Sequence, residues 1–513
     1  MSGGRGRRTA RLISRALSDE TRRTLRGRWN RNDSLDWGAG QRAARARALR
    51  VLLEELGPLY VKVGQILATR PDMVPDHVRE ELALLNDQVS ARPFAEFETV
   101  LVAELGEEWR GLFGEIHTEV PLGSASLAQV YRAVTIGGRD CVIKIQRPGS
   151  EAAVRDDMAV LRRVTGLIGR CAPHFSEVVD IDAMASMLFE VMKDELDFTR
   201  EARTMKKARK LARGYPRVKV PKVLLATPRV LVQTFADGVP ANQLKDDQLT
   251  SRQRKEVAYQ LMEFMFHGYF IDRHFHADPH PGNILVAEDG TAHVIDWGMA
   301  GRIDRGTGAS MIGALLGMAR NDGAALARSW IRLGAATPWS NTAAFTSDVV
   351  RLVPRWADAS LEEVYFGVAL MELGRCATRR GIQISPVISV IGKSVANIEG
   401  TVRCIYPQLK FADATERSLK DIVQHLAGEV LSREQLAQTF LDCVHAIATV
   451  PGELQSLLAD AAGGHLVVRA RTNLGDPVSP GRRHRLPTAG SLARSVAGAA
   501  VLGWILTRKK HRT

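Results

Sequence analysis

The stretch HADPHPGNILVAEDGTAHVIDWG, residues 276–298, contains the most specific pattern in the chain. Asn283 follows Asp278 by five positions, and Asp296 follows Asn283 by thirteen. Between Asn283 and Asp296 lie two apolar runs, ILVA and AHVID, around an Asp-Gly pair, which is a strong signal for a β-hairpin. A hairpin brings its two ends together, so the sequence predicts that oxygen atoms of Asp278, Asn283 and Asp296 converge.

Three converging oxygen ligands suit Mg²⁺, a hard cation that shares its coordination shell with nucleotide phosphates. Phosphoryl transfer needs few other side chains, because the protein mainly positions groups and neutralises charge. Protein kinases show the same order: a catalytic-loop Asp, an Asn five positions later, and then the Asp of an Asp-Phe-Gly motif, which here reads Asp296-Trp297-Gly298. The spacing therefore predicts magnesium-assisted phosphoryl transfer.

Two simpler interpretations of this stretch stay open. A polar turn beside an ordinary hairpin would need no ligand. The three histidines His274, His276 and His280 suggest zinc, but no cysteine or second spaced histidine pair supports that site. Packing and loop hydrogen bonding are the more usual roles of such histidines.

Composition indicates a globular protein in a reducing compartment. The chain has 513 residues, of which 45% are hydrophobic, enough for two or three lobes with their own cores. Its five cysteines stand far apart without a Cys-x-x-Cys pair. No apolar run follows the basic N-terminus, so no secretory signal is expected.

The positive charge is concentrated at the N-terminus. Residues 1–50 contain 14 Arg and no Lys against four acidic residues, a net charge of +10 out of +13 for the whole chain. Such an arm can bind anionic lipid or nucleic acid. Nucleic acid is the weaker choice of partner, because no aromatic-interleaved basic motif or zinc module accompanies the arm. A solvated arm without a partner stays open.

The next segment, LRVLLEELGPLYVKVGQILATRPDMVP, predicts two helices that meet at Gly57-Pro58. On the second helix, Lys62 and Gln65 share a face, and Gly64 leaves room for close approach of another backbone. From this stretch alone, an exposed Lys and Gln on an amphipathic helix is the better interpretation.

Residues 119–147 predict strands, EVPLGSASLAQVYRAV and CVIKIQRP, around the turn GGRD. Lys144 lies in the β-branched run, where protein kinases carry the lysine that binds the α- and β-phosphates. A phosphate loop should precede it, and the chain has Gly123-Ser124-Ala125-Ser126 there. Small side chains let backbone amides approach phosphate. A lone strand lysine is otherwise an ordinary edge residue.

A helix is predicted from about residue 184 to residue 211, and it carries Glu195, Asp197 and Glu201. One of these acids should pair with Lys144, because an unpaired lysine would be poorly aimed at phosphates. Between Lys144 and this helix, QRPGSEAAVRDDMAVLRRVTGLIG predicts an additional helical insertion.

In their order, these motifs resemble those of the UbiB family of atypical, protein-kinase-like proteins, over about residues 49–410. The resemblance implies an α+β, bilobal protein-kinase-like fold with an N-terminal helical extension, a helical insertion in the small lobe and a helical large lobe. It implies ATP and Mg²⁺ as cofactors. Lys144 is expected to pair with Glu201, Asp278 to take the catalytic-loop position, and Asn283 and Asp296 to hold the metal.

The same resemblance assigns the remaining site residues. Lys62 and Gln65 would lie on a helix that covers the place where a protein kinase admits its peptide, and Glu195 and Asp197 would line the same covered pocket. The nucleotide-binding residues would be Gly123, Ser124, Ala125, Ser126, Lys144 and Gln65.

The function implied is that of an atypical kinase or ATPase that hydrolyses Mg·ATP or phosphorylates a small or lipid-like acceptor, in support of isoprenoid quinone biosynthesis. The expected partners are ATP, a membrane lipid or quinone precursor, and other quinone-biosynthesis proteins. Gly123 and Ser124 stand where the family loop is alanine-rich, and Trp297 stands in place of Phe.

Two alternatives of other classes stay open. Aminoglycoside phosphotransferases share the His-x-Asp-x-His-x-x-Asn loop and the Ile-Asp-Trp, as in His276 to Asn283 and Ile295 to Trp297, but they lack the Lys-x-Gly-Gln helix. A small-molecule phosphotransferase is therefore the second choice. A catalytically weak nucleotide-binding scaffold is the third.

The C-terminal end predicts membrane contact. Val496 to Leu506 is an uninterrupted apolar run, shorter than the roughly 20 residues of a spanning helix, and a basic cluster follows Trp504. The protein is expected on the cytoplasmic side of the membrane, peripheral or anchored by this helix. The expected parts are a basic arm (1–48), the helical extension (49–118), the small lobe (119–236), the large lobe (237–470), a linker (471–490) and the apolar helix with its basic end (491–513).

Overall fold

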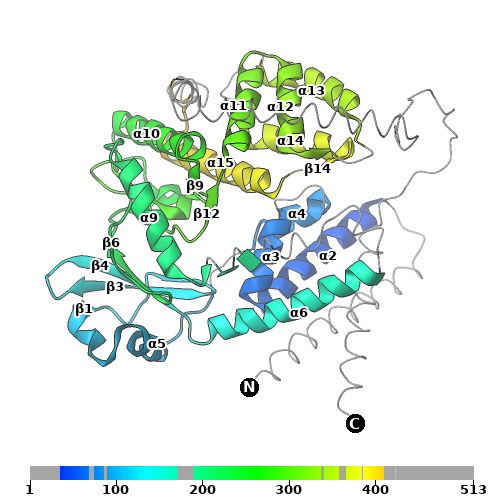
Figure 1. Ribbon diagram of the computed structural model, residues 1–513. Helices are drawn as coiled ribbons and strands as arrows, with labels where there is room; N and C mark the ends of the chain where they lie inside the picture. The colour runs from blue at the N-terminus through cyan, green and yellow to red at the C-terminus, as the bar shows by residue number, and fades with distance from the viewer. Residues whose placement is uncertain are drawn as a thin grey trace, which may run out of the picture. The chain divides into compact units, whose positions relative to one another are not determined.

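The computed structural model describes residues 35–409 except 69–73, 86–88, most of 172–194, 337–339, 358–365 and 384, and it also describes residues 422 and 424. By internal packing the chain divides into two units, residues 1–415 with 493–513 and residues 416–492. All helices and strands given below belong to the first unit (Figure 1). The predicted linker and apolar C-terminal helix lie outside the described residues.

The helical extension consists of α2 (Leu35–Leu56), α3 (Pro58–Ala68) and α4 (Asp76–Leu82). The predicted break is confirmed, because Gly57 has a φ of 108° and Pro58 opens the next helix. Helix α2 begins inside residues 1–48, the segment predicted as a basic arm, so residues 35–48 are helical. Gly64 is the point of closest packing, since a Cβ there would lie 2.2 Å from Leu85 and 2.8 Å from Leu53.

The small lobe is built on a six-stranded antiparallel sheet of order β1-β3-β4-β7-β6, with β2 paired to β3. Helix α5 (Ala95–Leu105) and the short helix η1 (Glu107–Leu112) pack against it through a core that includes Phe97, Trp109 and Tyr131. The strands are β1 (Phe113–Ile116), β2 (Gly123–Ser124), β3 (Ala128–Thr135), β4 (Asp140–Gln146), β6 (Val223–Ala226) and β7 (Val230–Thr234).

The small lobe begins further upstream in the chain than the predicted boundary at residue 119. Strand β1 and helix α5 fall within residues 49–118, which were expected to be helical extension, yet they share the core of the sheet. The large aromatic side chains Phe97 and Trp109 explain this, because they are buried in the core that covers the sheet. The predicted insertion is present as α6 (Ser150–Cys171).

The helix predicted from about residue 184 to residue 211 is interrupted. A turn at Leu196 separates helical residues up to Glu195 from α9 (Phe198–Ala212). Asp197 has an extended backbone and caps α9 by accepting a hydrogen bond from the Thr199 amide at 3.0 Å. A capping aspartate favours this break, because its side chain satisfies an amide that a continuous helix would pair internally.

The large lobe begins with β8 (Val239–Pro240), η2 (Ala241–Gln243) and α10 (Ser251–Phe270), which starts with a capping box of Thr250 and Gln253. The predicted hairpin is confirmed as β10 (Ile284–Val286) and β11 (Ala292–Val294), with Gly290 at a φ of 74° in its turn. Strand β5 (Val218–Lys219) pairs with β11, and β8 pairs with β10. A second ribbon joins β9 (His274–His276) to β12 (Ala300–Arg302).

Helices fill the rest of the large lobe, as expected, within the part of the chain that the structure describes. They are α11 (Arg305–Ala319), α12 (Gly323–Leu333), α13 (Thr342–Ala357), α14 (Phe366–Arg379) and α15 (Pro386–Ile405), with a short ribbon of β13 (Ala335–Ala336) and β14 (Ile382–Gln383). Helix α15 packs against both α10 and α14. None of the described helices is long and apolar enough to cross a membrane.

Candidate active site

Lys144 and Glu201 form an ion pair between β4 and α9. In the sheet, Lys144 lies opposite Val130 on one side and Leu231 on the other. Its Nζ lies 3.1 Å from Oε1 and 3.0 Å from Oε2 of Glu201. Glu201 is in the first turn of α9 and is only 4% exposed. The structure thus brings together two residues that are 57 positions apart.

The same lysine also contacts Asp296, with 2.8 Å between Nζ and Oδ1. Asp296 has a φ of 55°, in the left-handed region that few residues other than glycine adopt. Such strain persists where surrounding contacts over-determine it, often at functional sites. The Asp296 side chain keeps 51% of its surface exposed, so one face of its carboxylate is open to a ligand.

The charged side chains of this cluster shift one another's pKa values. Burial disfavours a charged Lys144, but the carboxylates of Asp296 and Glu201 outweigh it and raise the lysine pKa. Attraction to Lys144 holds the pKa of Asp296 below its usual range. Burial raises the pKa of Glu201, against the pull of Lys144. A cationic Lys144 beside an ionised Asp296 is the state that phosphate and metal binding require.

Asp278 is held by two side chains of α15. Asn397 Nδ2 donates to Asp278 Oδ1 at 2.5 Å, and Lys393 Nζ lies 3.1 Å from Oδ2. The same helix anchors the backbone around Asp278, because Ser394 donates to the carbonyl of His276 and Thr401 to that of Pro279. Both oxygens of Asp278 therefore have fixed directions.

His276 joins the loop of Asp278 to that of Asp296. Its Nδ1 accepts from the amide of Asp278, and its Nε2–H donates to the carbonyl of Ile295, each at 3.1 Å. The ring is 1% exposed, and burial lowers its pKa, so the imidazole is neutral. Its ring packs edge-on against Trp297, with 4.8 Å between centroids. Within the described residues, no three His, Cys, Asp or Glu side chains are grouped in a way that could hold a metal ion.

Asn283 is oriented by the hairpin. Its Nδ2 donates to the carbonyl of Asp278 at 3.1 Å, and its own carbonyl accepts from the amide of Ile295 at 2.9 Å. This fixes the amide so that Oδ1 is available, since none of the described residues donates to it. An ionised, half-exposed Asp296 together with this amide oxygen fits the hard oxygen ligands that Mg²⁺ takes.

The small-residue loop is anchored from the side. Gly123 and Ser124 pair with β3, and the Ala125 amide closes a turn onto the Ala128 carbonyl. Arg147, only 7% exposed, donates through Nε to the Ala125 carbonyl at 2.8 Å and through Nη2 to Ser124 Oγ at 2.7 Å. Ala125 and Ser126, the second half of the predicted phosphate loop, lie in the connection between β2 and β3.

Lys62 of α3 reaches the start of the segment after Gly298. Its Nζ lies 2.5 Å from Glu195 Oε1 and 3.1 Å from Met299 Sδ, and it is 5% exposed. The expectation that Lys62 is exposed on an amphipathic helix is therefore wrong. Asp197 is directed elsewhere, because its carboxylate caps α9 and accepts from Thr199.

Gln65 and Asp278 line one cavity of about 490 Å³ between α3, α4, α14 and α15. Its walls are largely apolar, with Leu82, Leu370 and Ile388 among them. The structure thus places Gln65 and Asp278 on the wall of one cavity, although more than two hundred residues separate them in the chain.

Sequence reasoning missed Lys393, Asn397 and Arg147. Lys393 and Asn397 interrupt the apolar stretch ISVIGKSVANIEG four positions apart, so they share one face of a helix, which is a signal that could have been noted. Arg147 follows Lys144 by three positions, but nothing in that strand shows that it turns back to the loop.

A strand lysine paired with a helical glutamate, next to a metal-binding aspartate and a catalytic loop, is the arrangement of protein kinases. Residues 84–330 match the family model of the ABC1 atypical kinase-like domain. The protein is therefore atypical kinase-like, with the bilobal α+β fold predicted.

Sequence similarity to two relatives shows which family of atypical kinase-like proteins the chain belongs to. The chain is 34% identical over 375 residues to an aarF domain-containing protein kinase of Arabidopsis thaliana, covering 72% of this chain and 52%, about half, of that relative. It is 31% identical over 374 residues to the probable protein kinase UbiB of Cellvibrio japonicus, covering 72% of this chain and 67% of the relative. The chain belongs to the UbiB family.

A solved structure also aligns with the chain. The complex of Rv3197 with erythromycin from Mycobacterium tuberculosis has a TM-score of 0.49 and 23% sequence identity to it, over 76% of this chain and 95% of that one.

Proposed function

We propose that this protein binds Mg·ATP at Lys144 and Asp296 and either hydrolyses it slowly or transfers its γ-phosphoryl group to a small or lipid-like acceptor. The contact of Lys144 with both Glu201 and Asp296 carries this proposal. These two contacts hold the ammonium group of Lys144 where the nucleotide phosphates and the metal ion would bind, as in protein kinases.

Each residue has a defined task in this proposal. Lys144 binds phosphate oxygens, while Glu201 keeps it in position. Asn283 Oδ1 and the Asp296 carboxylate would hold Mg²⁺, which neutralises phosphate charge when bound. Asp278, fixed by Asn397 and Lys393, orients the hydroxyl or water that attacks.

The cavity next to Asp278 supports a small acceptor. Its volume of about 490 Å³ is that of a small-molecule site, and its apolar walls suit a lipid-like body with its hydroxyl toward Asp278. Because α3 and α4 form part of its wall, the cavity suits a small acceptor better than a folded protein substrate. This same observation keeps a small-molecule phosphotransferase as the second candidate.

We also propose that the reaction takes place at the membrane, in isoprenoid quinone biosynthesis. Relatives that carry the UbiB name support isoprenoid quinone biosynthesis as the pathway, with a membrane-borne quinone precursor as acceptor and other proteins of that pathway as partners. The basic N-terminal arm and the C-terminal apolar run would hold the protein at the cytoplasmic side of the membrane.

Nucleotide titrations with two single variants test the site. Asp296→Asn should weaken Mg-dependent ATP binding, because a charged ligand is lost, whereas Asp278→Asn should reduce turnover more than binding. Calorimetry with and without Mg²⁺, together with phosphate release, measures both. If both variants bind and hydrolyse Mg·ATP like the parent, the assignment is wrong. Efficient phosphorylation of an aminoglycoside by the parent would favour the second candidate.

A further inference from the structure

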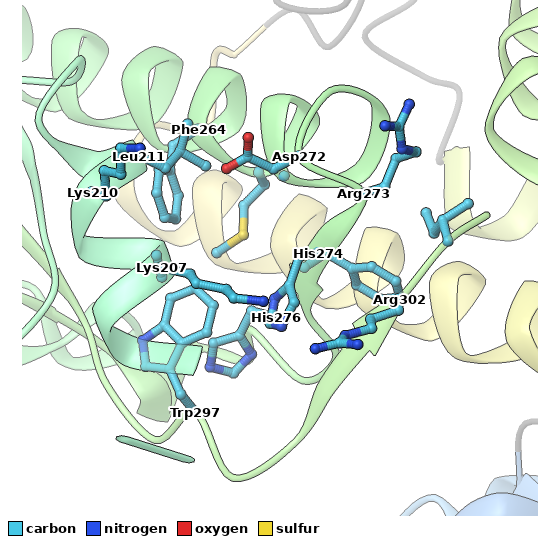
Figure 2. Close-up of a pocket in the computed structure, with 15 residues that line it drawn as sticks. Lys207, Lys210, Leu211, Phe264, Asp272, Arg273, His274, His276, Trp297 and Arg302 are labelled. Atoms are coloured by element: carbon cyan, nitrogen blue, oxygen red, sulfur yellow. The ribbon is translucent and has the colours of Figure 1, made fainter. Parts of the chain in front are cut away.

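A second cavity, of about 630 Å³, lies beside the candidate active site but does not include Lys144, Asp278 or Asp296. It is formed by α9, α10 and the β9–β12 ribbon (Figure 2). Trp297 and His276 contribute to its wall, so the cavity backs directly onto the two loops of the candidate active site.

Positive charge dominates the lining of this cavity. Lys207 and Lys210 come from α9, Arg273 precedes β9, and Arg302 ends β12, against one acid, Asp272. Among the described residues, neither Lys207 nor Arg302 forms an ion pair with a carboxylate. In Figure 2, Lys207 and Arg302 reach from opposite sides toward His274, while Arg273 and Lys210 point outward.

The half-buried ring of His274 lies between Lys207 and Arg302 in the wall of the cavity. Burial lowers its pKa, and the nearby charges of Lys207 and Arg302 lower it further. The imidazole is therefore neutral and can donate one hydrogen bond. Two cations and a donor in the wall of one cavity attract a compact, multiply charged anion, and a guanidinium suits phosphate oxygens in particular.

Apolar side chains form the rest of the wall, including Leu211, Phe264 and Phe275. They can contact an organic group attached to the anion. We propose that this cavity binds the phosphate of a phosphorylated small molecule or lipid headgroup, with Lys207 and Arg302 as its phosphate-binding residues.

The position of these residues gives the ligand a regulatory effect. Lys207 lies six residues after Glu201 on α9, and Arg302 lies six residues after Asp296. A phosphate bound by both would join the helix that positions Glu201 to the strand that follows Asp296. It would stabilise the arrangement in which Lys144 contacts both acids, and thereby couple the two sites.

Binding of phosphate-bearing probes to the full-length chain tests this proposal. The probes are inorganic phosphate, phenyl phosphate, and phosphatidylcholine vesicles with and without phosphatidic acid, all at constant ionic strength. Lys207→Ala and Arg302→Ala should each weaken binding about tenfold, the loss of one charge-assisted hydrogen bond. Arg302→Lys should retain part of the affinity.

Two controls make the outcome decisive. Lys206→Ala removes an equal charge from an exposed neighbour on α9 that does not line the cavity, and Lys144→Ala removes the phosphate-binding lysine of the candidate active site. Lys206→Ala should leave probe binding unchanged, and Lys144→Ala should weaken it less than Lys207→Ala or Arg302→Ala does. Tighter binding of phenyl phosphate than of inorganic phosphate identifies a soluble ligand, and binding only to phosphatidic acid vesicles identifies a lipid. Either result supports the site.

Three results would overturn the proposal. Loss of binding in Lys144→Ala alone would place the phosphate in the candidate active site. An equal loss in Lys206→Ala would show diffuse attraction to a basic helix. No saturable binding of any probe would show that the cavity takes no phosphate. Because none of these readouts uses ATP turnover, they do not depend on the proposed catalytic function.

Discussion

Asn397 donates a hydrogen bond to Asp278 across 2.5 Å, although 119 residues separate them in the chain. With Lys393 on the other oxygen, one helix of the large lobe fixes the direction of the candidate catalytic carboxylate. Precise orientation of such a carboxylate matters for aligning a nucleophile.

Asn397→Ala is expected to lower ATP turnover about tenfold while nucleotide affinity stays unchanged, because only the orientation of Asp278 is lost. Steady-state phosphate release and nucleotide titration measure the two quantities. Cys404→Ser, an exposed change on the same helix, is the control. Equal turnover in Asn397→Ala and the control would show that Asn397 does not position Asp278.

Lys144→Met should cost about 3 kcal/mol in free energy of unfolding at pH 7, because it leaves the buried Glu201 without its partner. Without Lys144, burial raises the folded-state pKa of Glu201 unopposed. A carboxyl with a raised folded pKa binds more protons when folded, so stability is greatest at low pH and falls as pH rises from about 4.3 through the folded pKa. The deficit of Lys144→Met should therefore shrink on acidification from pH 7 to 5.

Denaturant unfolding of Lys144→Met at the two pH values measures this effect. The double variant Lys144→Met with Glu201→Gln is the control, because its neutral amide cannot titrate. It should be more stable than Lys144→Met at pH 7 and should show less dependence on pH. The same pH dependence in both variants would assign the effect to other groups.

Gly64→Ala should destabilise the protein by about 1–3 kcal/mol, because the added Cβ overlaps Leu85 and Leu53 in a packed core. Gly40→Ala provides a matched control, since Gly40 lies in α2 with nothing within 4 Å of the added atom. It should stabilise by about 0.5–1 kcal/mol through helix propensity alone. Thermal unfolding compares the two. A neutral Gly64→Ala would mean that α3 does not pack tightly in solution.

Anionic vesicles should bind the full chain in a manner that weakens with salt, because the N-terminal arm carries +10 within residues 1–50 and a basic cluster ends the tail. Each basic residue near the surface contributes about 1 kcal/mol before screening. Removal of residues 491–513 should reduce co-sedimentation. Full competition by DNA, together with no effect of the deletion, would instead favour nucleic acid and contradict the membrane assignment.

The sequence alone was sufficient for the local parts of this protein. The hairpin between Asn283 and Asp296, the break at Gly57-Pro58 and the strand around Lys144 all follow from turn residues and periodicity, because they depend on hydrogen bonds between near neighbours. The order of the motifs was enough for the family, since their offsets along the chain are specific.

Only the tertiary structure decided which distant groups meet. It placed Glu201 beside Lys144, as the family resemblance implied, and it placed Asp197 at the start of α9 and Asn397 beside Asp278. It also formed two cavities open to solvent, one lined in part by Asp278 and one lined in part by Trp297. These contacts depend on how the helices pack against the sheet. Packing is determined by the combined burial of side chains that lie far apart in the chain. Local periodicity carries no information about that burial.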